Sequence, residues 1–209
     1  MNKKIIIPFI VIIISAITIF LIPENSNMPS SDNLYQYGFT FYDVEKIKLS
    51  LSEKNIFMST PTPVTDHTIK NYCAIRDEIL SSITYCTTTA IQGSDGRSLG
   101  NISMGGVPDN PIMAIAFIES SPSLDSKSNE VEIIFKTMIE TLVCDCWNDK
   151  QPGGFESVNA WIDAAKIKYA ESSQTIPLKS TITGLSNETL ILEINYKNDS
   201  YLWTLIVLK

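Results

Sequence analysis

Four cysteines and one histidine are the residues of this chain with the most specific chemistry. The cysteines are Cys73, Cys86, Cys144 and Cys146, and the histidine is His67. An even number of cysteines in a chain outside the cytoplasm indicates disulfide bonds first. Cys144 and Cys146 are two residues apart near the end of an expected helix, where their side chains would diverge by about 200°. We therefore expect two long-range disulfides, each joining the Cys73/Cys86 region to the Cys144/Cys146 region.

A metal or thiol-redox site is the alternative interpretation of the same residues. Cys144 and Cys146 could supply two thiolates, and Cys73, Cys86 or His67 could complete a tetrahedral site. Zinc sites usually combine two close cysteine pairs, however, and only one close pair occurs here. A thiol–disulfide exchange site would favour a helix N-terminus, whereas Cys144 and Cys146 fall near an expected helix C-terminus. Disulfides remain the leading expectation, and no metal or other cofactor is assigned.

No motif in the chain identifies a catalytic residue. There is no G-x-S-x-G sequence and no Ser-x-x-Lys sequence, and His67 is expected at the surface near the start of a helix. Residues 145–149 are acidic but lack the spacing of a calcium loop, so we interpret them as a solvated helix end. No carboxylate pair stands out as a general acid and base. The sequence therefore favours a noncatalytic protein and nominates no catalytic residue.

Three sites match the N-glycosylation pattern N-x-[ST]. They begin at Asn101, Asn187 and Asn198. Asn187 and Asn198 fall at expected strand turns, where a glycan has room. These sites matter only if the host cell glycosylates exported proteins.

The N-terminal segment determines the expected location of the chain. Residues 5–22 contain no charge and follow Lys3 and Lys4. As a helix this run would span about 27 Å, close to the hydrocarbon thickness of about 30 Å. The lysines favour a cytoplasmic N-terminus, and no small-residue cleavage site follows the run. We expect residues 1–22 to be a signal anchor of a single-pass cell-membrane protein, with secretion after cleavage as the alternative.

The remainder of the chain is polar and acidic. Residues 23–38 are rich in Asn, Ser and Pro and are expected to form a linker. Residues 24–209 contain all 23 acidic residues and 14 of the 16 basic ones, for a net charge of −9. This charge disfavours nucleic acid and anionic lipid headgroups as partners. The membrane, through the N-terminal helix, is the one partner that the sequence indicates, and no protein or small-molecule partner is identified.

Hydrophobic periodicity and turn residues predict one extracytoplasmic α+β domain over residues 39–209. Alternating or continuous apolar runs predict strands, and apolar residues three and four apart predict helices. The expected strands are residues 39–51, 56–58, 85–92, 97–103, 112–118, 175–185, 189–197 and 201–208, and the expected helices are residues 66–82, 130–147 and 155–171. The order β-β-α-β-β-β-α-α-β-β-β favours a mainly antiparallel sheet with about three helices on one face.

Two functional hypotheses follow from these patterns. The first is a membrane-tethered extracytoplasmic domain, held together by disulfides, with a noncatalytic role in binding or in envelope structure. The second is an extracytoplasmic metal-binding or thiol-redox protein that uses Cys144 and Cys146. The state of the four cysteines distinguishes the two hypotheses.

Overall fold

The structure is a computed structural model that describes residues 38–65, 67–73, 81–172 and 176–209. Residues 38–209 form one unit. The expected anchor over residues 1–22 and the linker up to residue 37 lie outside the described residues. Within the described part of the chain, no helix is both long enough and apolar enough to cross a membrane.

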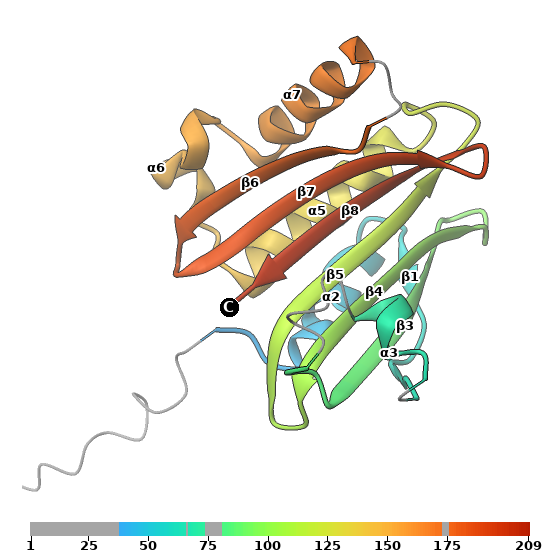
Figure 1. Ribbon diagram of the computed structural model, residues 1–209, viewed down its shortest axis with the longest axis vertical. Coiled ribbons are helices and arrows are strands. Elements are labelled where there is room, and N and C mark those ends of the chain that lie inside the picture. The colour runs from blue at the N-terminus through green and yellow to red at the C-terminus, as the bar shows by residue number, and fades with distance from the viewer. Residues whose placement is uncertain (1–37, 66, 74–80, 173–175) are drawn as a thin grey trace, which may run out of the picture. The chain divides into compact units, whose positions relative to one another are not determined.

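An antiparallel sheet of eight strands is the centre of the domain (Figure 1). Its strand order is β1-β3-β4-β5-β8-β7-β6, and β2 pairs with β3 beside β1. The strands are β1 (Phe57–Met58), β2 (Thr62–Pro63), β3 (Tyr85–Gln92), β4 (Ser98–Val107), β5 (Asn110–Ser120), β6 (Leu178–Leu185), β7 (Glu188–Lys197) and β8 (Ser200–Leu208). The expected α+β class with a mainly antiparallel sheet is therefore confirmed.

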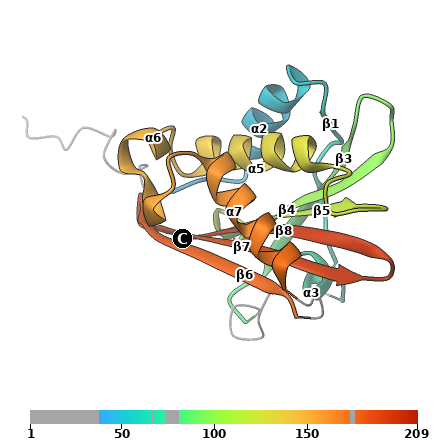
Figure 2. The same cartoon turned by 90° about the horizontal axis from the view of Figure 1, so that it is seen from above.

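Among the described residues, three longer helices cover one face of the sheet, and a short helix lies on the other (Figure 2). The longer helices are α2 (Asp43–Ser52), α5 (Ser128–Leu142) and α7 (Val158–Glu171). The short helix is α3 (Ile69–Tyr72), and α6 (Trp147–Lys150) with the 3-10 turn η2 (Pro152–Gly154) connects α5 to α7. The helix expected over residues 155–171 is confirmed and begins at Val158, after the capping side chain of Ser157.

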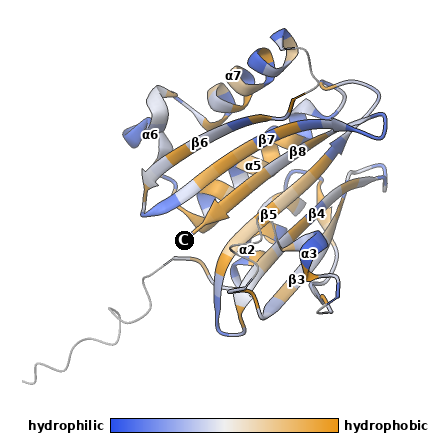
Figure 3. Cartoon of the chain, in the orientation of Figure 1, coloured by the Kyte–Doolittle hydropathy of each residue, from blue (hydrophilic) through white to orange (hydrophobic). Residues whose placement is uncertain are grey.

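Strand β5 is buried on both faces, as its apolar sequence predicts. It lies between β4 and β8 in the interior of the sheet. Ala114 and Ala116 face the large core under α2, α5 and α7, whereas Met113 and Ile115 face a smaller core beside α3. Figure 3 shows the same concentration of hydrophobic residues along β5, β7 and β8. The sheet therefore separates two cores of unequal size.

The first expected strand, over residues 39–51, is wrong, because the chain forms helix α2 there. Val44, Ile47 and Leu51 are buried at helical spacing, whereas Leu49 is 67% exposed. The helix begins where Asp43 Oδ2 accepts a hydrogen bond from the Thr40 backbone N–H at 2.6 Å. A side chain that satisfies a free N–H at this end favours helix over strand.

Two further boundaries differ from expectation. The helix expected to reach residue 147 ends at Leu142, and residues 143–146 form a non-helical connection to α6. The strand expected over residues 97–103 continues beyond that end, because β4 extends to Val107. Of the helix expected over residues 66–82, the structure describes α3, while residues 66 and 74–80 lie outside the described residues.

The tight turns agree with their sequences. Residues 93–97 connect β3 to β4, and Gly96 has a φ of +74°. Asn198 and Asp199 connect β7 to β8 with φ values of 54° and 62°. Positive φ at both central residues matches the twist of the flanking strands. The structure therefore contains both hairpins at the positions that these turn residues favour.

Candidate functional site

The four cysteines form two short-range disulfides, so the expected long-range pairing is wrong. Cys73 pairs with Cys86 across a Cα–Cα distance of 6.2 Å. Cys144 pairs with Cys146 across 5.1 Å. The expectation assumed that Cys144 and Cys146 lie on a helix, where their side chains would point apart. Because α5 ends at Leu142, both cysteines lie beyond the helix and can pair with each other. Neither disulfide connects the two regions.

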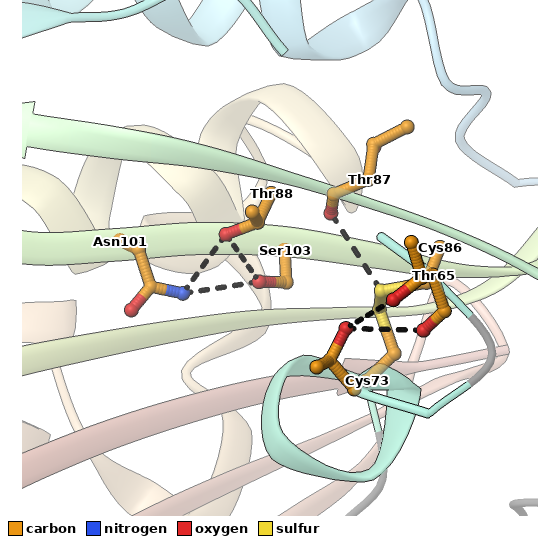
Figure 4. Close-up of a disulfide and its surroundings, with 8 residues drawn as sticks. Thr65, Cys73, Cys86, Thr87, Thr88, Asn101 and Ser103 are labelled. Atoms are coloured by element: carbon orange, nitrogen blue, oxygen red, sulfur yellow. Dashed lines mark hydrogen bonds between the residues drawn. A yellow bond between two sulfur atoms is a disulfide. The ribbon is translucent and has the colours of Figure 1, made fainter. Parts of the chain in front are cut away.

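The Cys73–Cys86 disulfide lies in the smaller core (Figure 4). Cys73 follows α3 and Cys86 belongs to β3, and the two residues are 0% and 1% exposed. Gly105 of β4 lies opposite Cys86, and a Cβ added to Gly105 would lie 2.9 Å from the Cβ of Cys73. The disulfide therefore fixes α3 against the sheet in a closely packed site that solvent does not reach.

The Cys144–Cys146 disulfide lies at the surface of the larger core. It spans the non-helical connection between α5 and α6, with both cysteines partly buried and Asp145 between them exposed. Both cysteines retain some contact with solvent. A thiol from another molecule needs such access in order to attack a disulfide. This disulfide is therefore the more accessible of the two.

A polar pocket of about 140 Å³ lies beside this disulfide. Lys136 Nζ and Glu140 Oε1 lie 3.6 Å apart at its wall. Ser157 Oγ accepts the Ala160 N–H at 3.0 Å and caps α7. The pocket is lined by Lys136, Glu140, Asp145, Trp147, Asn148, Ser157, Val158 and Asn159. It brings Asp145, from within the Cys-x-Cys sequence, next to the N-terminus of α7.

Trp147 anchors the connection that carries the Cys144–Cys146 disulfide. Its side chain is 5% exposed, and its Nε1–H donates a hydrogen bond to the Phe155 carbonyl at 3.1 Å. Its ring lies 5.7 Å from the ring of Trp161 on α7. Burial of an indole with its N–H satisfied is strongly stabilising. Packing of Trp147, in addition to the disulfide, therefore holds this connection in place.

The metal interpretation finds no assembled site in the part of the chain that the structure describes. There, no three His, Cys, Asp or Glu side chains lie close enough to hold a metal ion. All four cysteines are in disulfides and so present no thiolate. His67 is exposed in the turn before α3. Neighbouring Asp66 lies outside the described residues.

The three glycosylation patterns occupy different environments. Asn101 lies within β4, where its Nδ2 donates hydrogen bonds to Thr88 Oγ1 at 3.3 Å and to Ser103 Oγ at 3.0 Å (Figure 4). A glycan attaches to this same nitrogen, so it would disrupt these hydrogen bonds, of which the one to Thr88 joins β4 to β3. Asn187 and Asn198 are exposed in turns with φ values of 69° and 54°. The two turn sites therefore suit modification better than Asn101.

Two buried carboxyl groups with shifted pKa values were missing from the sequence-based candidates. Burial raises the pKa of Asp43, but hydrogen bonds from Lys46 and Thr40 outweigh it, so the pKa lies below its usual value. Burial raises the pKa of Glu188, which is 5% exposed. The Thr40-x-x-Asp43 spacing is a helix-start signal that could have identified the first group. No pattern around Glu188 marks it, because its burial depends on the β6–β7 pairing.

Comparisons of the chain with known proteins return no relative. No family model, no curated protein and no solved structure matches it. Function must therefore be inferred from the residues and geometry of this domain.

Proposed function

We propose that this chain is a noncatalytic extracytoplasmic domain, tethered to the membrane by residues 1–22, that binds a partner or contributes to envelope structure. The observation that carries the proposal is the Cys73–Cys86 disulfide, which is fully buried in a core. Disulfides that serve as permanent structural bonds form in oxidising compartments and are rare in the cytosol. The domain is therefore suited to the outer side of a membrane.

The sequence before the domain supports the same location. Residues 5–22 are uncharged and apolar, and a polar segment over residues 23–37 separates them from the domain. A helix of this length matches the hydrocarbon thickness. The net charge of −9 over residues 24–209 favours a partner other than nucleic acid.

The test counts the free thiols of the chain and determines on which side of the membrane the domain lies. The full chain is expressed with its N-terminal segment, denatured and alkylated without reductant, and its intact mass is measured. We expect no added alkyl groups, and four after reduction as the control. In intact cells or spheroplasts, an impermeant protease should cleave the domain, and carbonate washing should leave the chain in the membrane fraction. Free thiols together with a protected domain would contradict the proposal.

Thiol–disulfide exchange at Cys144–Cys146 is the second candidate function. The observation that favours it is the position of this disulfide, partly exposed and beside a polar pocket. A thiolate from a small thiol or a protein dithiol would attack one sulfur, form a mixed disulfide and release the other cysteine as a thiolate. A second thiol of the reductant would then resolve the mixed disulfide. The domain would gain two electrons and two protons, and the reductant would become a disulfide.

Stepwise reduction tests this second function. The native chain is titrated with dithiothreitol, quenched with an alkylating reagent and mapped by peptide mass. We expect labels on Cys144 and Cys146 at reductant concentrations that leave Cys73 and Cys86 unlabelled, because thiolate access controls the rate. Simultaneous reduction of both disulfides, or reduction of Cys73–Cys86 first, would rule out a dedicated exchange site.

A further inference from the structure

Strand β6 leaves one edge of the sheet open beside helix α7. Among the described residues, β6 pairs with β7 and with no other strand (Figure 1). An edge strand presents unpaired backbone N–H and C=O groups that can pair with another extended chain. The groups on the free side of β6 are therefore a template for a further strand.

A pocket of about 150 Å³ lies between this edge strand and α7. Phe155, Trp161, Ala164 and Leu178 give it an apolar interior, and Lys168 and Lys179 also line it. A cavity of about 150 Å³ holds a benzene-sized group, which corresponds to one apolar side chain. The pocket and the strand edge lie side by side, since Leu178 and Lys179 belong to both.

The wall between the pocket and the core is held by a hydrogen bond from a buried tryptophan. Trp161 is 1% exposed, and its Nε1–H donates a hydrogen bond to Ser180 Oγ on β6 at 2.8 Å. This bond fixes the helix to the edge strand. A preformed site avoids the ordering cost that binding otherwise incurs.

The charges at the pocket are basic in a domain that is acidic. No carboxylate belongs to the pocket lining among the described residues. Lys168 is exposed, and none of the ion pairs in the described part of the chain involves it. Lys179 Nζ lies 3.3 Å from Glu193 Oε1, so its charge is already paired. Lys168 is therefore the free cation that an acidic ligand would meet.

We propose that the α7–β6 groove, defined by the free edge of β6 and this pocket, binds an extended acidic peptide of a partner protein. The peptide adds to β6 as an antiparallel strand, places one apolar side chain in the pocket and directs a carboxylate to Lys168. Strand addition draws affinity from backbone hydrogen bonds and specificity from alternate side chains. This inference rests on the proposed binding function and identifies its surface.

The first test measures peptide binding to the full chain in detergent micelles by fluorescence anisotropy. The probe is a labelled short peptide in which Leu and Glu alternate with Thr, and the comparison peptide carries Lys at each Glu position. We expect saturable binding of the acidic peptide and at least about fivefold weaker binding of the basic one, because exchange of the charge replaces attraction by repulsion. Methylation of the peptide nitrogens that face β6 should weaken binding at least about tenfold, since it removes the backbone hydrogen bonds that hold the added strand.

Two pairs of variants locate the site on the domain. Lys168→Glu should weaken binding of the acidic peptide about fivefold, whereas Lys70→Glu, an exposed change of equal charge on α3, should leave it unchanged. Ala164→Leu fills the pocket and should abolish binding, whereas Ala170→Leu on the exposed surface of α7 should not. Circular dichroism confirms that each variant is folded.

Several outcomes would overturn the inference. If methylation of the peptide nitrogens leaves binding unchanged, the peptide is held by its side chains alone and does not add to β6 as a strand. A concentration-dependent dimer that Ala164→Leu abolishes would assign the groove to a second copy of this chain. Absence of any peptide binding would remove the groove as a docking site. The topology and alkylation results do not depend on this groove, so its failure leaves the proposed function standing.

Discussion

Cys73–Cys86 and Cys144–Cys146 close chain segments of different lengths in different surroundings. The first pair is 13 residues apart, is fully buried and joins α3 to β3. The second pair is two residues apart, is partly exposed and spans a connection between two helices. In the chain-entropy model, the first disulfide contributes about 3 kcal/mol to the free energy of unfolding, and the second about 1.5 kcal/mol.

Loop length is one part of a disulfide's effect, and the other contacts that hold the same region are a second part. The segment around Cys73 has only the short helix α3 and a small core beside it, so the disulfide is a major restraint. The segment around Cys144 adjoins the large core and contains Trp147, whose ring and N–H are both engaged. The first disulfide is thus a main restraint on its region, whereas the second shares that task with the packing of Trp147.

The largest expected effect comes from removing the anchor of the second region. Trp147→Ala should lower the free energy of unfolding by about 3–5 kcal/mol, because it leaves a cavity beside Trp161 and an unpaired Phe155 carbonyl. Denaturant unfolding followed by circular dichroism measures this. Trp147→Phe is the matched control and should cost less, since it keeps most of the ring contact. If Trp147→Ala lowers the free energy of unfolding by less than about 1 kcal/mol, the disulfide and not Trp147 is the main anchor of this connection.

Removal of the buried disulfide is next. The double substitution Cys73→Ala and Cys86→Ala should lower the free energy of unfolding by about 3 kcal/mol, because the unfolded chain regains the freedom of the closed loop. Hydrogen exchange of the α3 amides should also accelerate relative to those of α5. Unchanged protection of α3 would mean that the small core holds this helix without the disulfide.

A smaller change tests how tightly the buried disulfide is packed. Gly105→Ala places a Cβ 2.9 Å from the Cβ of Cys73 and 3.0 Å from its Sγ. Overpacking of this kind costs about 1–3 kcal/mol. Asp145→Ala, beside the exposed disulfide, is the control and should change stability by less than about 0.5 kcal/mol. Equal effects of the two substitutions would contradict the contrast in packing between the two disulfides.

Local signals in the sequence predicted most of the sheet. The hairpin residues around Gly96 and Asp199 determine their turns through positive φ, and residues 111–118 of β5 are apolar because both faces of this strand are buried. The segment of α2 was ambiguous, since Ile47 and Leu51 fit both an alternating and a helical pattern. The hydrogen bond between Asp43 and Thr40 favours the helix, and hydrophobic periodicity carries no information on such a side-chain contact.

The disulfide pairing and the α7–β6 groove depend on tertiary structure. The apolar stripe of α5 continues in sequence to Cys146, so no periodicity indicated that the helix ends at Leu142. That end is what allows Cys144 to reach Cys146. The groove requires β6 to be the edge strand, and the strand order that makes it so is set by pairings between distant segments. Sequence periodicity carries no information on such pairings.

The smallest expected effect is the removal of the exposed disulfide. The double substitution Cys144→Ser and Cys146→Ser should lower the free energy of unfolding by about 1.5 kcal/mol or less, because the closed segment is short and both positions retain contact with water. Denaturant unfolding gives this value, and hydrogen exchange over residues 143–150 shows whether Trp147 still holds the connection. A loss of about 3 kcal/mol, equal to that for the buried disulfide, would make both disulfides structural and would remove the basis for thiol exchange at Cys144–Cys146. A small loss with intact protection would show that this connection tolerates both redox states, as an exchange site requires.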